Sequence, residues 1–301
     1  MNATNEPGRP TAAPTTAQAG ERGDAAAMLR HLVSNIGYEV MPFKAAEESV
    51  ARFVPTDVPL TVTTTAAKGV AATVDLAERL TARGYEVAPH LAARQITGRT
   101  ELTEIMQRLT AAGITKAFVI GGDPPEPAGA YVDALGVLRD LNAAGSTLNT
   151  VGIGGYPEGH GTIPGPAMAQ AIRDKAPLAS HIVTQICFDA GTIGAWGEGL
   201  MRDNVTLPIY VGMPGPVNRQ KLIRISAGIG LGQSARFLQK QQGLWRFFLP
   251  GAYNPTRLVR RLATEAARSQ GNLFGLHIFT FNEIEGTEKW RLRLRSQVGL
   301  D

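Results

Sequence analysis

The feature that most constrains the fold is an alternation of short β-rich runs with helical stretches, which begins near Gly37 and continues almost to the end of the chain. The helical stretches carry leucine or alanine at three- and four-residue spacing, and several close on a glycine. Parallel strands need a crossover between them, so this alternation predicts an α/β protein built from βα units. Eight runs are predicted as strands, at residues 38–43, 60–65, 85–91, 116–123, 148–158, 181–189, 207–213 and 275–282.

Eight such units match the size of a (β/α)8 TIM barrel, which we predict as a single domain over residues 26–301. Residues 214–274, between the last two runs, contain three helical patterns, so extra helices are expected before the last strand. An open, doubly wound sheet is the alternative, although no G-x-G-x-x-G motif follows the first strand. Residues 1–25 are rich in Pro, Thr, Ala and Gly, and we expect a disordered tail there.

Composition excludes several classes of function. The 30 basic residues exceed the 26 acidic ones by only four, and no basic block interleaved with aromatics suggests a nucleic-acid partner. No apolar run reaches the roughly 18 residues that a membrane helix needs, and the tail has no targeting pattern. A single cysteine, Cys187, excludes an intrachain disulfide and a cysteine-rich metal site. We therefore expect a soluble, cytoplasmic protein without a bound metal and without a membrane partner.

Polar residues gather where the predicted strands end, and in a barrel that edge carries the active site. Any one of them has a structural explanation as a turn former, a helix cap, a strand former or a core residue. Their joint placement on successive strands favours a functional site. The residues are Glu39, Thr63, Thr64, His90, Asp123, Tyr156, His160, Gln185 and Asp189.

Glu39 is the most informative of these residues because it interrupts an apolar strand, "GYEVMPF". Strand alternation places it on the face of Met41 and opposite Tyr38 and Val40. A carboxylate that faces a barrel lumen is costly unless it is paired, and desolvation favours the neutral form of such a group, which can donate a proton. An ion pair with a Lys or Arg on a neighbouring strand is the structural alternative, but no strand core carries an obvious cation.

Eight short motifs occur along the chain in one order: "YEVMPF", "VTTT", "PHL", "IGGDPP", "GGYPEGHG", "TQICFD", "PIYVGMPG" and "HIFTFNE". In this order and spacing they resemble the methylenetetrahydrofolate reductase family over nearly the whole chain after the tail. The resemblance implies reduction of 5,10-methylenetetrahydrofolate to 5-methyltetrahydrofolate with electrons from a nicotinamide, in the one-carbon metabolism that serves methionine biosynthesis. It also implies a small-molecule folate as the partner, and gives no oligomeric state.

The resemblance assigns roles to individual residues. Glu39 would protonate the nitrogen that departs when the substrate ring opens. Asp123 would bind the pterin and stabilise the cation that develops, and Gln185 would bind the pterin edge through its amide. Phe279, in the last strand, is the remaining residue expected to bind the substrate.

The family relays hydride through flavin adenine dinucleotide, FAD, and its cofactor contacts survive only in part. The retained positions are Thr63, Ala66, His90, Gly122, Asp123, Tyr156, His160, Lys175 and Gln185. The positions that differ are Gly121, where the family has an arginine, and Met168, Ala171 and Asp174. Loss of positive charge at a pyrophosphate site argues against tight FAD binding. We therefore hypothesise direct hydride transfer from NADH or NADPH, between which the sequence does not choose.

The last strand departs from the family as well. Phe279 and Glu283 replace a tyrosine and an arginine, so a cation expected near the aminobenzoyl-glutamate end of the folate is missing. Candidate replacements are Arg246, Arg257, Arg260 and Arg261. Two other functions stay open at this stage: a folate-dependent one-carbon transferase, and a non-catalytic barrel that binds folate or a partner.

Overall fold

A computed structural model describes residues 16–217, 254–269 and 272–300, and it shows a closed barrel of eight parallel strands in sequence order. The first strand pairs with the second and also with the eighth, which closes the ring. This arrangement confirms the predicted (β/α)8 barrel and excludes the open sheet. The strands are β1 Ile36–Val40, β2 Leu60–Val62, β3 Val87–Ala92, β4 Lys116–Ile120, β5 Thr150–Gly155, β6 His181–Thr184, β7 Ile209–Pro214 and β8 Leu273–Phe279.

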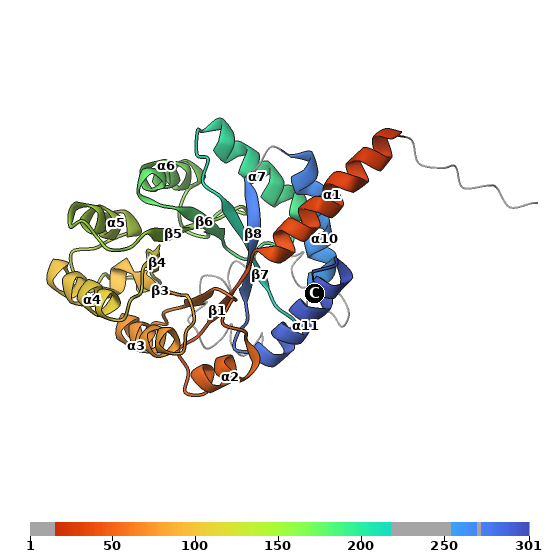
Figure 1. Cartoon of the computed structure of the whole chain (residues 1–301). Coiled ribbons are helices and arrows are strands. Elements are labelled where there is room, and N and C mark those ends of the chain that lie inside the picture. The colour runs from red at the N-terminus through yellow and green to blue at the C-terminus, as the bar shows by residue number, and fades with distance from the viewer. Residues whose placement is uncertain (1–15, 218–253, 270–271, 301) are drawn as a thin grey trace, which may run out of the picture.

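Helices form an outer ring around these strands (Figure 1). Of the three helical patterns expected before the last strand, the third is observed as α10, and the patterns at 219–228 and 232–241 lie outside the described residues. The helices of the ring are α2 Ala46–Phe53, α3 Gly69–Ala82, α4 Arg99–Ala111, α5 Ala134–Ala143, α6 Gly165–Lys175, α7 Ala190–Arg202, α10 Pro255–Arg268 and α11 Ile284–Gln297, with short 3-10 turns at Ala93–Gln95 and Ala176–Leu178.

A further helix, α1 Thr16–Ser34, precedes β1 and includes residues 16–25 of the segment expected as a disordered tail. Residues 17–34 contain no proline, and the alanines at 25–27 favour a helix. Near its end Leu32 and Val33 are almost fully buried, and the helix packs along α10. Tertiary packing therefore holds the end of this helix that adjoins β1. Residues 1–15 lie outside the described residues.

The orientation of β1 is fixed from outside the barrel. Tyr38, fully buried, donates its hydroxyl hydrogen to the carboxylate of Glu288 at 2.7 Å, and Arg291 donates to the same carboxylate at 2.9 and 2.7 Å. Burial, and next the charge of Glu288, raise the pKa of the Tyr38 hydroxyl, which keeps it a donor. With Tyr38 held against α11, alternation turns Glu39 to the lumen, as predicted from the sequence.

Rings fill the barrel lumen. His90 and Phe118 have centroids 4.8 Å apart, and Phe118 lies stacked against His277 at 6.5 Å. This packing leaves no room for a side chain on some facing strands, because a Cβ at Gly152 would lie 2.5 Å from both His181 and Phe118. The lumen is therefore a packed aromatic core, with its polar groups held among rings.

Candidate active site

Glu39 lies on the lumen face of β1, one residue before the strand ends, and its side chain is 14% exposed. Its Oε2 atom lies 3.4 Å from Nε2 of His277 and 3.6 Å from Nε2 of His90. Both imidazoles are buried. Among the described residues, then, the partners of this carboxyl group are two histidines and not the Lys or Arg that would make it a structural ion pair.

The environment of His90 keeps it neutral. Burial lowers the pKa of its imidazole to about 4, although the charge of Glu39 acts in the opposite direction. Neither ring nitrogen has a hydrogen-bond partner within the described part of the chain. A neutral imidazole at this position adds no positive charge beside Glu39.

The junction of β1 with β8 is locked at the carboxyl ends of the strands. The Thr280 hydroxyl donates to the backbone oxygen of Glu39 at 2.6 Å, and the Asn282 side chain exchanges two hydrogen bonds with the backbone of Met41 at 2.9 and 3.0 Å. Phe281 and Asn282 both adopt positive φ values, 48° and 58°, which a phenylalanine adopts only under constraint. This turn fixes the backbone that carries the carboxyl group.

Asp123 stands on a loop after β4 that the rest of the structure holds in place. Gly122 has φ +93°, and a Cβ there would lie 3.2 Å from Ala92, so a larger residue would strain the turn. Arg94 spans the loop and donates to the backbone oxygens of Pro124 at 2.7 Å, of Val132 at 2.9 Å and of Pro125. Asp123 is therefore presented on a rigid loop, with its side chain exposed.

Asp123, Tyr156 and His160 form a second polar group, from the ends of β4 and β5. The rings of Tyr156 and His160 meet edge to face at 5.2 Å. Partial loss of hydration raises the pKa of Asp123, and the nearby His160 acts against that rise. Burial, and next the charge of Asp123, raise the pKa of Tyr156, while burial lowers the pKa of His160. At neutral pH this group therefore carries hydrogen-bond donors and acceptors around one carboxylate.

The residues predicted to bind folate lie at the ends of β6 and β8. The backbone N–H of Gln185 donates to Gly155 at 2.7 Å, and its side-chain oxygen accepts from the N–H of Ile186 at 2.9 Å. The side chain is exposed, and its NH2 group makes no hydrogen bond within the described residues. The Phe279 ring meets His277 edge to face at 5.1 Å. Phe279 therefore joins the imidazole beside Glu39 to the outer part of the site.

The remaining predicted positions are less closely tied to these two groups. Thr63 follows β2, and its N–H donates to the backbone oxygen of Val40 at 2.9 Å, which places it beside β1. Lys175, at the end of α6, is half-buried, and burial lowers the pKa of its amine although the charge of Asp133 acts against this. Cys187 is fully buried, and burial raises the pKa of its thiol to about 12, so it is a protonated core residue.

Three residues that matter for this geometry were not among the sequence predictions: His277, Arg94 and Asn282. His277 had a detectable signal, because alternation in "GLHIFTFN" puts it on the face of Phe279. Arg94 had none, since its role depends on a loop about thirty residues later.

Two negative findings limit the chemistry of the described residues. No group of three or more His, Cys, Asp and Glu side chains among them is placed to hold a metal ion. None of their helices has the length and apolar character required to cross a lipid bilayer.

The fold and the site together define a (β/α)8 barrel with an acid, two imidazoles and a carboxylate-bearing loop at the carboxyl ends of its strands, where barrel enzymes carry their active sites. The family model for "Methylenetetrahydrofolate reductase" matches residues 39–229. The chain therefore belongs to the methylenetetrahydrofolate reductase family, and this membership indicates a folate-related one-carbon reduction.

Solved structures of similar shape include a putative phosphonomutase from Burkholderia cenocepacia J2315, with 12% identity, coverage of 90% of this chain and 99% of that chain, and a TM-score of 0.47. Another is Yersinia pestis DHPS with a pterine-sulfa conjugate, with 10% identity, coverage of 89% and 95%, and a TM-score of 0.44. At these TM-scores neither similarity supports a conclusion about function.

Proposed function

We propose that the protein reduces 5,10-methylenetetrahydrofolate to 5-methyltetrahydrofolate with NADH or NADPH, and that hydride passes directly to the folate without flavin. The observation that carries the proposal is the setting of Glu39, a lumen carboxyl group whose described partners are two buried imidazoles. A carboxyl group paired with a cation would be held as an anion, whereas one between imidazoles can cycle its proton.

In this reaction Glu39 donates a proton to the nitrogen that departs as the five-membered ring of the substrate opens. Breaking that carbon–nitrogen bond leaves an iminium cation, and Asp123 stabilises its positive charge. The nicotinamide, when bound, supplies the hydride that the methylene carbon accepts, which yields the methyl group. Gln185 holds the pterin edge, and the π-face of Phe279 covers the ring.

The two imidazoles position the Glu39 carboxyl group. Nε2 of His277 is within hydrogen-bond reach of Glu39 Oε2, at 3.4 Å. The proton that restores Glu39 after each turnover comes from solvent, and this hydrogen bond holds the carboxyl group in place between turnovers. His90, neutral and packed on Phe118, holds the other side of the same oxygen.

The flavin-free part of the proposal rests on the residues where a pyrophosphate would need cations. A Cβ at Gly121 meets nothing within 4 Å, so space for a side chain is present but the charge is not. On α6, Asp174 presents a carboxylate that accepts from Gln170 at 2.7 Å, while Arg173 is engaged by Asp203 at 2.8 Å. These positions do not fit a bound flavin pyrophosphate.

The nicotinamide can instead use the positions that the chain retains. We assign its binding to Thr63, His90, Gly122, Tyr156, His160 and Lys175, with Gln185 shared between cofactor and folate.

The test is to follow oxidation of NADH and of NADPH with methylenetetrahydrofolate, with and without added flavin. Wild type is expected to turn over equally well in both conditions, and Glu39→Gln to lose roughly a hundredfold or more in kcat. The matched control is Glu48→Gln on α2, an exposed acid that should leave kcat unchanged.

Three results contradict the proposal. Purified protein that carries stoichiometric flavin overturns the flavin-free transfer. Turnover that survives Glu39→Gln removes the acid assignment. No nicotinamide oxidation under any condition overturns the reductase and leaves the transferase and binding alternatives.

A further inference from the structure

A threonine and a glutamine form a hydrogen-bonded pair between the ends of β2 and β3. Thr64 is the second residue after β2, and Gln95 ends the short 3-10 turn that follows β3. The Thr64 hydroxyl donates to the side-chain oxygen of Gln95 at 3.0 Å, and both residues are half-buried. The pair therefore lies at the rim of the barrel that carries the candidate active site.

The backbone on both sides of this pair is held in place. Next to Gln95, the backbone N–H of Arg94 donates to the oxygen of Gly121 at 2.9 Å, which ties the turn to the end of β4. On the β2 side, the Thr73 hydroxyl donates to the backbone oxygen of Thr63 at 3.1 Å. The two side chains are thus presented in one geometry before a ligand arrives, which reduces the cost of binding.

Each member of the pair keeps one unused hydrogen-bonding group. The single hydroxyl hydrogen of Thr64 is directed to Gln95, so the lone pairs of the hydroxyl oxygen remain as acceptors. The amide oxygen of Gln95 is occupied, but its NH2 group has no partner within the described part of the chain. The pair therefore offers one acceptor and one donor side by side. A primary carboxamide, with one oxygen and one NH2 group, is the complement of this arrangement.

Three of the positions assigned to the nicotinamide surround the pair. Thr63 precedes Thr64, and His90 lies on β3, two residues before the strand ends. A Cβ at Gly122 would lie 3.7 Å from the Cβ of Arg94, so the end of β4 closely approaches the turn that ends at Gln95. The pair therefore belongs to the part of the rim where the nicotinamide is expected, on the ends of β2, β3 and β4.

We propose that Thr64 and Gln95 bind the carboxamide group of the nicotinamide ring. Gln95 donates from its NH2 group to the carboxamide oxygen, and the Thr64 hydroxyl oxygen accepts from the carboxamide NH2 group. These two bonds fix the rotation of the nicotinamide ring, and with it the face that presents the hydride to the folate. The inference rests on the proposed function and adds two residues to the cofactor positions named there.

The phosphates of the cofactor are the competing ligands, and the hydrogen-bonding groups of the pair favour the carboxamide. Phosphate oxygens only accept hydrogen bonds, so a phosphate would use the NH2 group of Gln95 and face the lone pairs of Thr64. Phosphates also bind most strongly to charged donors, and the Gln95 amide carries no charge. A phosphate would therefore leave half of the pair unused.

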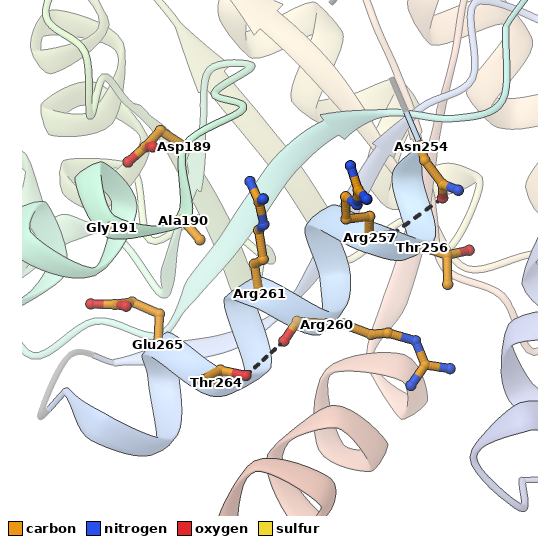
Figure 2. A pocket seen from close by; sticks show the side chains of 10 residues that line it. All are labelled: Asp189, Ala190, Gly191, Asn254, Thr256, Arg257, Arg260, Arg261, Thr264 and Glu265. Carbon is orange, nitrogen blue, oxygen red and sulfur yellow. Dashed lines mark hydrogen bonds between the residues drawn. The ribbon is translucent and has the colours of Figure 1, made fainter. Parts of the chain in front are cut away.

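A groove of about 620 Å³ between α7 and α10 is a second place at which a cofactor could bind (Figure 2). It lies across the barrel from the pair, because α7 follows β6 and α10 precedes β8. The charged residues that line it are Arg257, Arg260, Arg261, Asp189 and Glu265. Arg246, the remaining arginine named from the sequence, lies outside the described residues. A lining of full charges suits charged groups and not an uncharged carboxamide.

The test measures binding by calorimetry and requires no turnover. The probes are whichever of NADH and NADPH binds more tightly, its 3-acetylpyridine analogue, in which a methyl group replaces the carboxamide NH2, and the same dinucleotide without its nicotinamide ring. Wild type is expected to bind the natural dinucleotide about fivefold more tightly than the analogue, within the range of one net hydrogen bond. Thr64→Val removes the acceptor and should bring this preference close to one.

Gln95→Leu should weaken the natural dinucleotide and the analogue alike, by about fivefold, because both keep the carbonyl oxygen to which Gln95 donates. Neither variant should change binding of the dinucleotide without its ring. Matched controls are Thr103→Val and Gln107→Leu, two exposed residues on α4. If Gln95→Leu lowers the melting temperature, Gln95→Glu replaces it, since the glutamate keeps the shape and the bond from Thr64 but lacks the NH2 group.

The outcomes separate this inference from the proposed function. Equal affinity of wild type for the natural dinucleotide and the analogue, or a Gln95→Leu protein that binds as well as Gln107→Leu, overturns the carboxamide assignment and leaves the reductase in place. Equal weakening of the dinucleotide without its ring assigns the pair to the phosphates and also overturns it. A wild type that binds no nicotinamide dinucleotide overturns both the inference and the proposed function.

Discussion

Replacing His90 with glutamine should remove a large part of the acid sensitivity of the fold. The imidazole is 4% exposed, packs on Phe118, and faces only two other titratable groups in the described structure, Glu39 and His277. Burial lowers its pKa to about 4, against about 6.5 in the unfolded chain. Between these values the unfolded chain binds a proton at this residue and the folded chain does not.

The sign and size of the pH effect on the free energy of unfolding follow from proton linkage. Above about pH 6.5 the residue is neutral in both states and contributes no pH dependence. As the pH falls through the unfolded pKa, protonation favours the unfolded chain, so the free energy of unfolding decreases until the folded pKa is reached. From about pH 7.5 to about pH 5 the loss due to His90 is about 2 kcal/mol, and its limit below about pH 4 is about 3 kcal/mol.

Urea denaturation of wild type and His90→Gln at several pH values measures this loss. The variant is less stable at neutral pH, because the glutamine amide is buried without partners, but its stability should fall about 2 kcal/mol less between the two pH values. Leu91→Val is the control, a fully buried neighbour without a titrating group whose substitution should lower stability equally at every pH. If His90→Gln keeps the wild-type pH slope, His90 is not held neutral in the fold and the reasoning fails.

Three further substitutions test other parts of the structure. Glu288→Gln leaves the buried guanidinium of Arg291 without its counter-ion and should lower stability by roughly 3–5 kcal/mol in urea denaturation; an effect below about 1 kcal/mol would contradict the anchoring of β1. Gly152→Ala should cost about 1–3 kcal/mol, because the lumen rings must shift for the methyl group, and an unchanged melting temperature would contradict this packing. Arg94→Gln frees the loop of Asp123 and should lower kcat/KM by about tenfold to a hundredfold with little change in melting temperature; unchanged kinetics would refute its positioning role.

The sequence predicted the barrel because each strand and each helix is a local pattern, but it predicted the strand ends poorly. The run at 181–189 reads as one strand, whereas β6 stops at Thr184. The ladder ends there because the neighbouring strand ends, with Gly155 paired to Thr184. Cys187, expected within this strand, is buried in the loop that follows β6. The apolar pattern of the sequence therefore continues past the end of the strand, and it made the strand look longer than it is.

The difference between a local sequence pattern and a contact between distant strands also explains which parts of the site were predictable. The position of Glu39 depends on alternation within one strand, which the sequence displays. Its contact with His277 depends on the closure of the barrel, because β1 and β8 are separated by almost the whole chain. The register of their pairing sets Gly37 beside His277 and Glu39 beside Phe279. One strand carries both constraints: Tyr38 fixes β1 to the outer helices through Glu288, and this anchor is what turns the next residue toward the imidazoles. A substitution that loosens the contact between Tyr38 and Glu288 should therefore impair the function of Glu39, although neither residue contacts its carboxyl group.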